Sequence, residues 1–214
     1  MRSAPRRSGA SPEMASPARV SAEAAIGPGV FVAVMGPSGS GKDTLIAHAK
    51  ARVDPDRVLF VRRIVTRAAD SAAEEHDTMS PHDFAEAETA GAFALSWPAH
   101  GLSYGLPASV DTAIASGQVA VANVSRAVLP LLKRRYRHVV AVVLGADPEV
   151  LAARIAARGR ESGEAISARL KRDPGIQFED ADVVRIDNGG ELQVAVDKLV
   201  SEIEAAIVTG AGRD

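Results

Sequence analysis

The feature that most constrains this sequence is a glycine-rich segment between an apolar run and a helix. Residues 30–35 are all apolar, as is typical of a strand buried on both faces of a parallel sheet. The residues that follow are Gly36, Pro37, Ser38, Gly39, Ser40, Gly41, Lys42, Asp43 and Thr44. They fit the pattern G-x-x-x-x-G-K, and a helix is predicted from there to about residue 52. A strand, this loop and a helix in that order predict a phosphate-binding loop rather than an accidental glycine-rich turn.

The chemistry of such a loop explains its composition. Glycines let the backbone curl so that successive N–H groups point at phosphate oxygens, and the start of the following helix adds positive potential. Lys42 supplies a mobile positive charge for the β- and γ-phosphates of a nucleotide. We therefore expect the whole segment 36–44 to bind ATP, with Gly39, Gly41, Lys42 and Thr44 cradling its phosphates.

The residue after the lysine departs from the usual pattern. That position normally carries a Ser or Thr whose hydroxyl meets Mg²⁺, whereas this chain has Asp43, with Thr44 next. A carboxylate can hold Mg²⁺ directly or through water. Alternatively, Asp43 only favours the positive end of the helix. Both interpretations stay open, and Mg²⁺ is expected as a cofactor.

The rest of the chain alternates between strand and helix patterns. Further strands are predicted at 58–65, 119–124, 138–144 and 183–186, and helices at 107–116, 126–135, 148–158, 164–172 and 191–207. Ser80 and Pro81 begin a short helix that ends near Gly91, and a small irregular β segment follows over 92–105. This order predicts an α/β fold with a central parallel sheet flanked by helices on both faces.

The first 29 residues differ from the rest in composition. They contain four of the 12 prolines and no aromatic side chain, without apolar periodicity, so residues 1–29 are predicted to be a disordered tail and residues 30–210 the folded domain. Three interpretations of this tail stay open: it is inert, the natural start of the chain is Met14, or the tail has a targeting or docking role. It lacks the apolar core of a secretory signal, and a cytoplasmic location is expected.

Composition excludes several classes of function. The chain has 25 Lys+Arg and 27 Asp+Glu, a net charge of −2, so no general attraction to nucleic acid is expected. It has no cysteine, which excludes disulfides, thiolate zinc sites and cysteine nucleophiles. Its apolar runs all fall short of the roughly 18–20 residues that cross a bilayer, so no membrane association is expected.

Several motifs follow the phosphate loop in a recognisable order. They are Val65-Thr66-Arg67, Trp97-x-x-His100-Gly101-x-x-Tyr104-Gly105, Arg154-x-x-x-Arg158-Gly159-Arg160 and Ala168-Arg169-Leu170. In order and spacing, from Gly36 to about Asp187, they resemble guanylate kinase and its nucleoside monophosphate kinase relatives. The resemblance implies a P-loop kinase fold with small acceptor-binding and arginine-lid insertions.

Departures from guanylate kinase suggest a different acceptor. Asp70 lies near the place of that family's second arginine, and the segment 72–80 has no aromatic side chain, although a purine site needs a flat stacking surface. The acidic stretch Ile-Asp-x-Gln-Gly is replaced at 121–126, with Asn123 and Arg126 making this wall less anionic, as an acceptor with an extra phosphate requires. These changes resemble ribose 1,5-bisphosphate phosphokinases, the guanylate-kinase-like branch of the carbon–phosphorus lyase pathway of phosphonate metabolism. Those enzymes use ATP to make 5-phospho-α-D-ribose 1-diphosphate.

The resemblance implies roles for individual residues. The catalytic set comprises Lys42, Arg154, Arg158 and Arg160, whose arginines would close over the transferring phosphoryl group unless they form a solvated helix face. The acceptor-binding set comprises Arg67, Glu75, His76, His100, Tyr104, Asn123, Ser125, Arg126 and Arg169. Arg67 is expected to grip a phosphate of the acceptor. Glu75 and His76 would bond ribose hydroxyls unless they belong to a polar loop without function.

The remaining members of the acceptor-binding set have alternatives too. His100 and Tyr104 face a pocket or are turn residues, and Trp97 is expected in the core. Asn123, Ser125 and Arg126 follow a central strand at its carboxyl end, the edge where open α/β sheets bind ligands.

Two other functions are compatible with these motifs. A nucleoside monophosphate kinase of the guanylate kinase type is disfavoured by the missing aromatics. A non-catalytic guanylate-kinase-like binding module is disfavoured by the intact phosphate loop. The expected partner is a small sugar bisphosphate, and the sequence leaves monomer and homodimer undecided.

Overall fold

The apolar run that precedes the phosphate loop forms the centre of a five-stranded parallel sheet. The computed structural model describes residues 25–67, 76–99, 101–157 and 183–211. The strands of this sheet, in their order across it, are β2 (Val58–Phe60), β7 (Val119–Asn123), β1 (Ile26–Met35), β8 (Tyr136–Gly145) and β9 (Val183–Asp187). All neighbouring strands are parallel. β1 lies in the middle, so the loop after Met35 emerges between two neighbouring strands.

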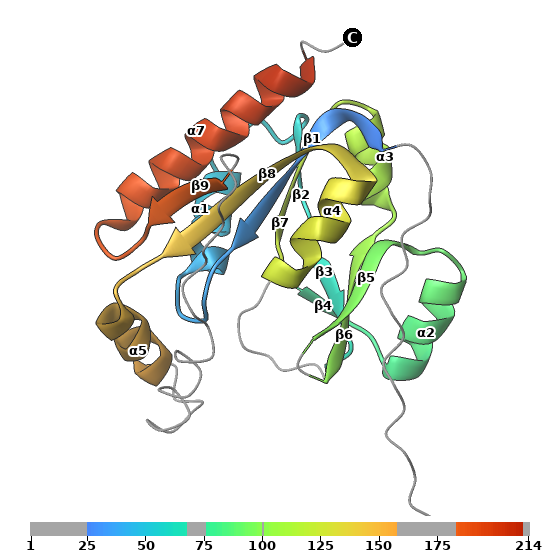
Figure 1. Ribbon diagram of the computed structural model, residues 1–214, viewed down its shortest axis with the longest axis horizontal. Coiled ribbons are helices and arrows are strands. Elements are labelled where there is room, and N and C mark those ends of the chain that lie inside the picture. The colour runs from blue at the N-terminus through green and yellow to red at the C-terminus, as the bar shows by residue number, and fades with distance from the viewer. Residues whose placement is uncertain (1–24, 68–75, 100, 158–182, 212–214) are drawn as a thin grey trace, which may run out of the picture.

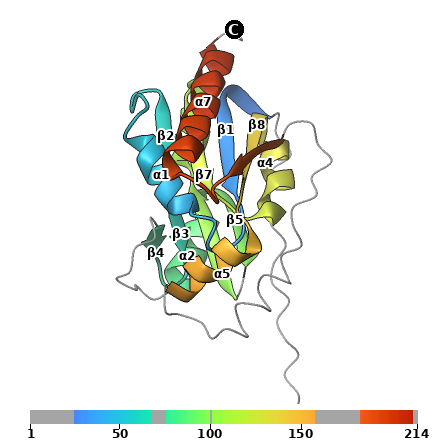
Figure 2. The ribbon, with the colours of Figure 1, turned by 90° about the vertical axis from the view of Figure 1, so that its left-hand side faces the viewer.

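Helices cover both faces of this sheet, as the buried side chains of β1 show. Val30, Val32 and Val34 pack on one face against α1 (Lys42–Lys50) and α7 (Leu192–Ala211). Phe31, Ala33 and Met35 pack on the other, against α3 (Ser109–Ala115) and α4 (Leu129–Arg135). Figure 2 separates α1 from α4, which lie on opposite sides of the sheet. The predicted α/β fold with a flanked parallel sheet is confirmed.

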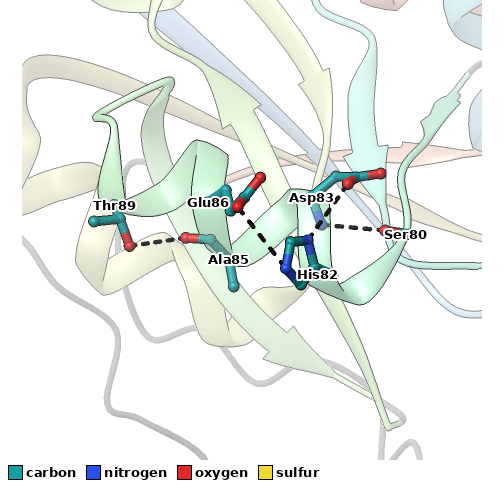
Figure 3. A network of polar contacts seen from close by, with 6 residues as sticks. All are labelled: Ser80, His82, Asp83, Ala85, Glu86 and Thr89. Atoms are coloured by element: carbon teal, nitrogen blue, oxygen red, sulfur yellow. Dashed lines mark hydrogen bonds and ion pairs between the residues drawn. The ribbon is translucent and has the colours of Figure 1, made fainter.

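A second, smaller sheet lies beside α2 (Pro81–Thr89). Its strands, in their order across it, are β4 (His76–Thr78), β3 (Arg63–Val65), β6 (Leu102–Pro107) and β5 (Phe93–Ala99). β5 and β6 form an antiparallel hairpin, which is more regular than the β segment predicted there. The start of α2 is confirmed, because the N–H of Asp83 donates to Ser80 Oγ at 3.1 Å (Figure 3).

The predicted strand 58–65 is wrong in one respect, because it is two strands in different sheets. β2 ends at Phe60, the N–H of Val61 still bonds to Val121 of β7, and β3 begins at Arg63 in the smaller sheet. If β2 continued in the parallel sheet, the consecutive residues Arg62 and Arg63 would point to opposite faces of it. Both faces are covered by helices, and an unpaired charge buried there is costly. Arg62 is instead exposed and forms an ion pair with Asp77.

Other boundaries also moved. β1 begins at Ile26, which pairs with Tyr136 before a register shift, so the strand extends four residues into the predicted tail because Gly27-Pro28 interrupts the apolar pattern without ending the strand. The predicted helix 126–135 begins as a 3₁₀ turn at 126–128. The predicted helix 164–172 and residues 1–24 lie outside the described residues.

The last described helix before that gap is α5 (Pro148–Ala157), which begins after Asp147 as predicted. Figure 1 shows α5 beyond the carboxyl ends of β1 and β8, close to the loop that leaves β1. None of the helices in the described ranges is long and apolar enough to cross a membrane.

Candidate active site

The glycine-rich loop has the strained backbone that its sequence predicts. Gly39 and Gly41 adopt φ angles of 80° and 83°, and residues with a Cβ atom rarely adopt such positive angles. A Cβ on Gly39 would lie 3.0 Å from Ile155 Cγ1 of α5, and one on Gly41 would lie 2.6 Å from Nδ2 of Asn188. Two separate reasons therefore favour glycine at both positions, the backbone conformation and the close packing.

Lys42, the first residue of α1, folds back across this loop. Its Nζ donates hydrogen bonds of 2.9 Å to the carbonyl oxygens of Gly36 and Pro37 and lies 3.4 Å from Ser40 Oγ. The ammonium group is thus held on the loop itself, where a bound phosphate would exchange for part of these contacts.

Asn188 closes the loop from the other side, and the sequence analysis did not select it. The residue follows β9, is only 3% exposed, and its Nδ2 donates to the carbonyl of Ser40 at 2.7 Å. The signal that could have found it is the one that selected Asn123, a polar residue at the carboxyl end of a strand of the parallel sheet.

A cavity of about 310 Å³ opens beside the loop. It is lined by Gly39, Gly41, Thr44, Arg154, Ala157, Asn188 and Leu192. Two buried polar atoms of these lining residues, Nη1 of Arg154 and Oδ1 of Asn188, have no hydrogen-bond partner within the described residues. Buried polar atoms are normally satisfied, so a donor and an acceptor beside the cavity lack a partner among the described residues.

On the opposite side of the loop, Asp43 meets the strand β7. Nδ2 of Asn123, the last residue of β7, donates to Oδ1 of Asp43 at 2.7 Å. Ser125 and Arg126 come next, at the start of the 3₁₀ turn, and Ser125 Oγ is buried without a hydrogen-bond partner in the described part of the chain. Burial lowers the pKa of Arg126, which an anionic ligand would offset.

Three of the predicted acceptor residues, Arg67, His76 and Tyr104, lie in or just after strands of the smaller sheet. Arg67 follows β3 directly after Thr66, which exchanges hydrogen bonds with the backbone of Ser103 at 3.0 and 2.8 Å. His76 is partly buried and begins β4.

Tyr104 belongs to the strand β6 rather than to a turn, so the interpretation of it as a turn residue is wrong. Its ring stacks on the Trp97 ring, with centroids 5.6 Å apart. The guanidinium carbon of Arg63 lies over the Tyr104 ring, 5.9 Å from its centroid. Trp97 is buried, as predicted for a core residue. Cross-strand stacking therefore accounts for the Trp and Tyr of this motif.

The structure brings together some of the predicted residues and not others. The loop residues 36–44, Arg154, Asn123, Ser125 and Arg126 lie at the carboxyl edge of the parallel sheet. Arg67, His76 and Tyr104 lie on the smaller sheet. The remaining predicted site residues lie outside the described residues: Glu75, His100, Arg158, Arg160 and Arg169.

A separate group of ligand-type side chains was not predicted. His82, Asp83 and Glu86 lie on α2, with ligand atoms all within 4.8 Å of one another (Figure 3). All three are exposed, and the two nitrogens of the His82 ring face different carboxylates, at 3.6 Å from Asp83 and 3.8 Å from Glu86. This geometry suits surface ion pairs in the first turns of a helix.

A phosphate loop on the central strand of a parallel sheet, with a smaller mixed sheet beside it, defines a P-loop kinase fold. Guanylate kinase from Anaplasma phagocytophilum has this fold, with a TM-score of 0.60 at 16% identity, over 84% of this chain and 87% of that one. A sugar kinase from Janibacter sp. HTCC2649 aligns with a TM-score of 0.50 at 17% identity, over 85% and 98%. At these identities the likeness concerns the fold alone.

Sequence relatives narrow the class to one family. Ribose 1,5-bisphosphate phosphokinase PhnN of Brucella melitensis is 52% identical over 165 residues, covering 77% of this chain and 86% of the relative. The proteins of the same name from Chelativorans sp. and Agrobacterium fabrum are 44% and 43% identical, over 83% and 77% of this chain and 86% and 91% of their own lengths. This chain belongs to the ribose 1,5-bisphosphate phosphokinase family. No protein-family model matches it.

Proposed function

We propose that this protein transfers the γ-phosphoryl group of ATP to the 1-phosphate of ribose 1,5-bisphosphate. An oxygen of the acceptor phosphate forms a bond to the γ-phosphorus, the bond from that phosphorus to the β–γ bridging oxygen breaks, and ADP leaves. The other product is 5-phospho-α-D-ribose 1-diphosphate. The name of the relatives, ribose 1,5-bisphosphate phosphokinase, supports this acceptor. We also propose a cytoplasmic role in phosphonate metabolism.

The observation that carries the nucleotide half of the proposal is the cavity beside the loop. It presents the backbone of Gly39 and Gly41 at the start of a helix, where anions bind well. Arg154 and Asn188 also line it, and each has a buried polar atom, Nη1 and Oδ1, without a partner among the described residues. A nucleotide supplies phosphate oxygens for the arginine and polar hydrogens for the amide oxygen. We assign Lys42 and Arg154 to neutralising charge on the phosphates during transfer.

The residues present also fit Mg²⁺. The carboxylate of Asp43 and the hydroxyl of Thr44 are oxygen ligands of the type that this cation prefers, and they stand in the first turn of α1 beside Lys42. When bound, Mg²⁺ supplies neutralisation of phosphate charge. We therefore assign Asp43 to the metal rather than only to the helix end.

Transfer to a phosphate needs no general base, because the attacking oxygen is already anionic. Positioning and charge neutralisation can then supply most of the catalysis. We assign Arg67 and Arg126 to holding phosphates of the acceptor, since guanidinium groups bind phosphate oxygens in pairs. Arg158, Arg160 and Arg169 complete the proposed arginine lid, and Glu75, His76, His100, Tyr104 and Ser125 the proposed acceptor site.

A coupled assay of ADP release tests the proposal. ATP and Mg²⁺ are supplied with ribose 1,5-bisphosphate or with GMP in parallel, using the wild-type protein and Lys42→Ala. We expect turnover of the sugar bisphosphate, little turnover of GMP, and a loss in the Lys42→Ala variant of at least about 100-fold. Lys50→Ala is the matched control, because Lys50 is exposed on the same helix.

Fast turnover of GMP would contradict the proposed acceptor and favour a guanylate kinase. If neither acceptor were used while ATP still bound, the acceptor would be a different phosphate compound. If ATP did not bind, the nucleotide half of the proposal would fail as well.

A further inference from the structure

The contact between Asn123 and Asp43 joins two parts of the site that the sequence analysis treated separately. Asn123 ends β7 and is in register with Val34 of β1, and the N–H of Val124 bonds to the carbonyl of Val34 at 3.1 Å. The backbone that carries the Asn123 side chain is therefore held by the sheet. Asp43 lies in the first turn of α1, and the 2.7 Å bond spans 80 residues of chain.

The chemistry of the pair constrains both residues. An ionised carboxylate only accepts hydrogen bonds, so the Asn123 side chain must present its NH₂ group to Asp43. An acid at position 123 would instead place two carboxylates in contact, and one of them would have to hold a proton. Asparagine at this position thus holds the Asp43 carboxylate in a single orientation.

The bond also determines what each side chain has left to offer. Within the described residues, Oδ2 of Asp43 takes no hydrogen bond, so one oxygen is held by the strand and the other is available as a ligand. The bond engages one N–H of the Asn123 NH₂ group and leaves the second N–H over. The orientation of the Asn123 amide is therefore set by Asp43.

We propose that Asn123 is a positioning residue that holds Asp43 as a ligand for the divalent cation. This inference deepens the proposed function and rests on it for the identity of the nucleotide. It assigns Asn123 to the donor site. It also explains how a carboxylate can replace the usual hydroxyl after the loop lysine, because the strand beside it carries a matching donor.

The test measures the metal without the acceptor. Free Mn²⁺ is followed by electron paramagnetic resonance while it is titrated into the protein saturated with a non-hydrolysable ATP analogue. We expect Asn123→Ala to weaken Mn²⁺ binding by about tenfold, the value of one hydrogen bond to a charged group, while affinity for the analogue without metal stays unchanged. Where the variant still turns over, its KM for ribose 1,5-bisphosphate should match the wild type.

Two further variants separate positioning from folding. Asn123→Asp should lower thermal stability in the absence of metal, because it opposes two carboxylates. The exchanged pair Asp43→Asn with Asn123→Asp restores a donor and an acceptor, so stability should recover while Mn²⁺ affinity is low, since the carboxylate is now on the strand. Gln118→Ala is the matched control. Gln118 directly precedes β7, and its side-chain amide donates a hydrogen bond of 2.8 Å to the main-chain carbonyl of Asp56. Removing this hydrogen bond should leave Mn²⁺ affinity unchanged.

Two results would overturn the inference. If Asn123→Ala raised the KM for ribose 1,5-bisphosphate and left Mn²⁺ affinity intact, Asn123 would be an acceptor ligand after all. If it lowered stability and left both quantities intact, the bond would serve folding only. The Mn²⁺ titration contains no acceptor, so an unchanged Mn²⁺ affinity in Asn123→Ala overturns the inference whichever acceptor the enzyme uses. Failure here is therefore distinguishable from failure of the proposed acceptor.

Discussion

The side-chain amide of Asn188 donates a hydrogen bond of 2.7 Å to the main-chain carbonyl of Ser40, which ties the end of β9 to the phosphate loop. Ser40 is fully buried, and its backbone carbonyl would otherwise need another partner. The same amide group occupies the space that a Cβ on Gly41 would take. The shape of the loop is therefore set in part by a residue that lies 148 positions away along the chain.

Replacing Asn188 should weaken nucleotide binding more than it weakens the fold. Asn188→Ala removes the bond to Ser40 and the buried Oδ1, which has no partner in the part of the chain that the structure describes. We expect ATP affinity to fall by about 3- to 30-fold, the value of one or two hydrogen bonds. Isothermal titration with ATP measures this. Gln193→Ala, which removes an exposed amide contact with Asp197 on α7, is the control. Unchanged affinity in Asn188→Ala would show that the cavity is not the nucleotide site.

A pair of glycine variants separates backbone strain from loop function. Gly41 and Gly91 both have positive φ angles, of 83° and 74°, but a Cβ would clash with Asn188 only at Gly41, and at Gly91 it would meet nothing within 4 Å. Each change to alanine should cost about 1–2 kcal/mol of folding free energy from the left-handed backbone. Only Gly41→Ala should also abolish ATP binding. Urea denaturation and ATP titration give the two quantities, and equal ATP affinity in both variants would contradict the expectation.

Arg154 should contribute to transfer rather than to folding. Its Nη1 is buried beside the phosphate loop without a partner in the described residues. We expect Arg154→Ala to lower kcat by on the order of 100-fold, as the loss of one charged donor at a developing charge does, with thermal stability unchanged or slightly raised. Arg134→Ala, on an exposed position of α4, serves as the control. Steady-state kinetics that match between the two variants would mean that Arg154 only belongs to a solvated helix face.

Stability at high pH should report on a buried tyrosine far from the site. Tyr136 stacks on Phe31 and donates to Asp111 Oδ1 at 2.8 Å. Arg135 also binds that carboxylate, through Nε at 2.9 Å and through Nη2. Burial, and then the charge of Asp111, raises the pKa of Tyr136 well above its ordinary value of 10.0. The folded protein therefore keeps this proton where the unfolded chain loses it.

The sign of the effect follows from proton binding. Above about pH 10 the unfolded state binds fewer protons than the folded state, so the free energy of unfolding falls as pH rises, by up to about 1.4 kcal/mol per pH unit. This stabilising contribution is complete below the unfolded pKa of Tyr136. Urea denaturation between pH 8 and pH 11 should show a shallower decline in Tyr136→Phe than in the wild type. Tyr104→Phe, which changes the only other tyrosine, should keep the wild-type slope, and an identical slope in all three proteins would contradict the assignment.

Much of the fold was predictable because its patterns are local. Six consecutive apolar residues followed by G-x-x-x-x-G-K predict a buried strand, an anion-binding turn and a helix from neighbouring residues alone. The cap of α2 at Ser80 and Pro81 is equally local. The strand pattern at 58–65 was misleading for the same reason, since neighbouring residues cannot show that Phe60 and Arg63 belong to strands of two different sheets.

The sequence by itself determined the parallel sheet, the phosphate loop and the kinase family, because each rests on residues close in the chain or on motifs in a fixed order. Only the tertiary structure decided which side chains make contact: Asn188 with Ser40, Asn123 with Asp43, and Trp97 with Tyr104. The first two contacts join a strand end to a loop or helix that lies far away in sequence, and the third follows from the register of a hairpin. Hydrogen bonds and ring stacking act over a few ångströms, so they depend on which strands lie side by side, and strand order is decided by packing of the whole core.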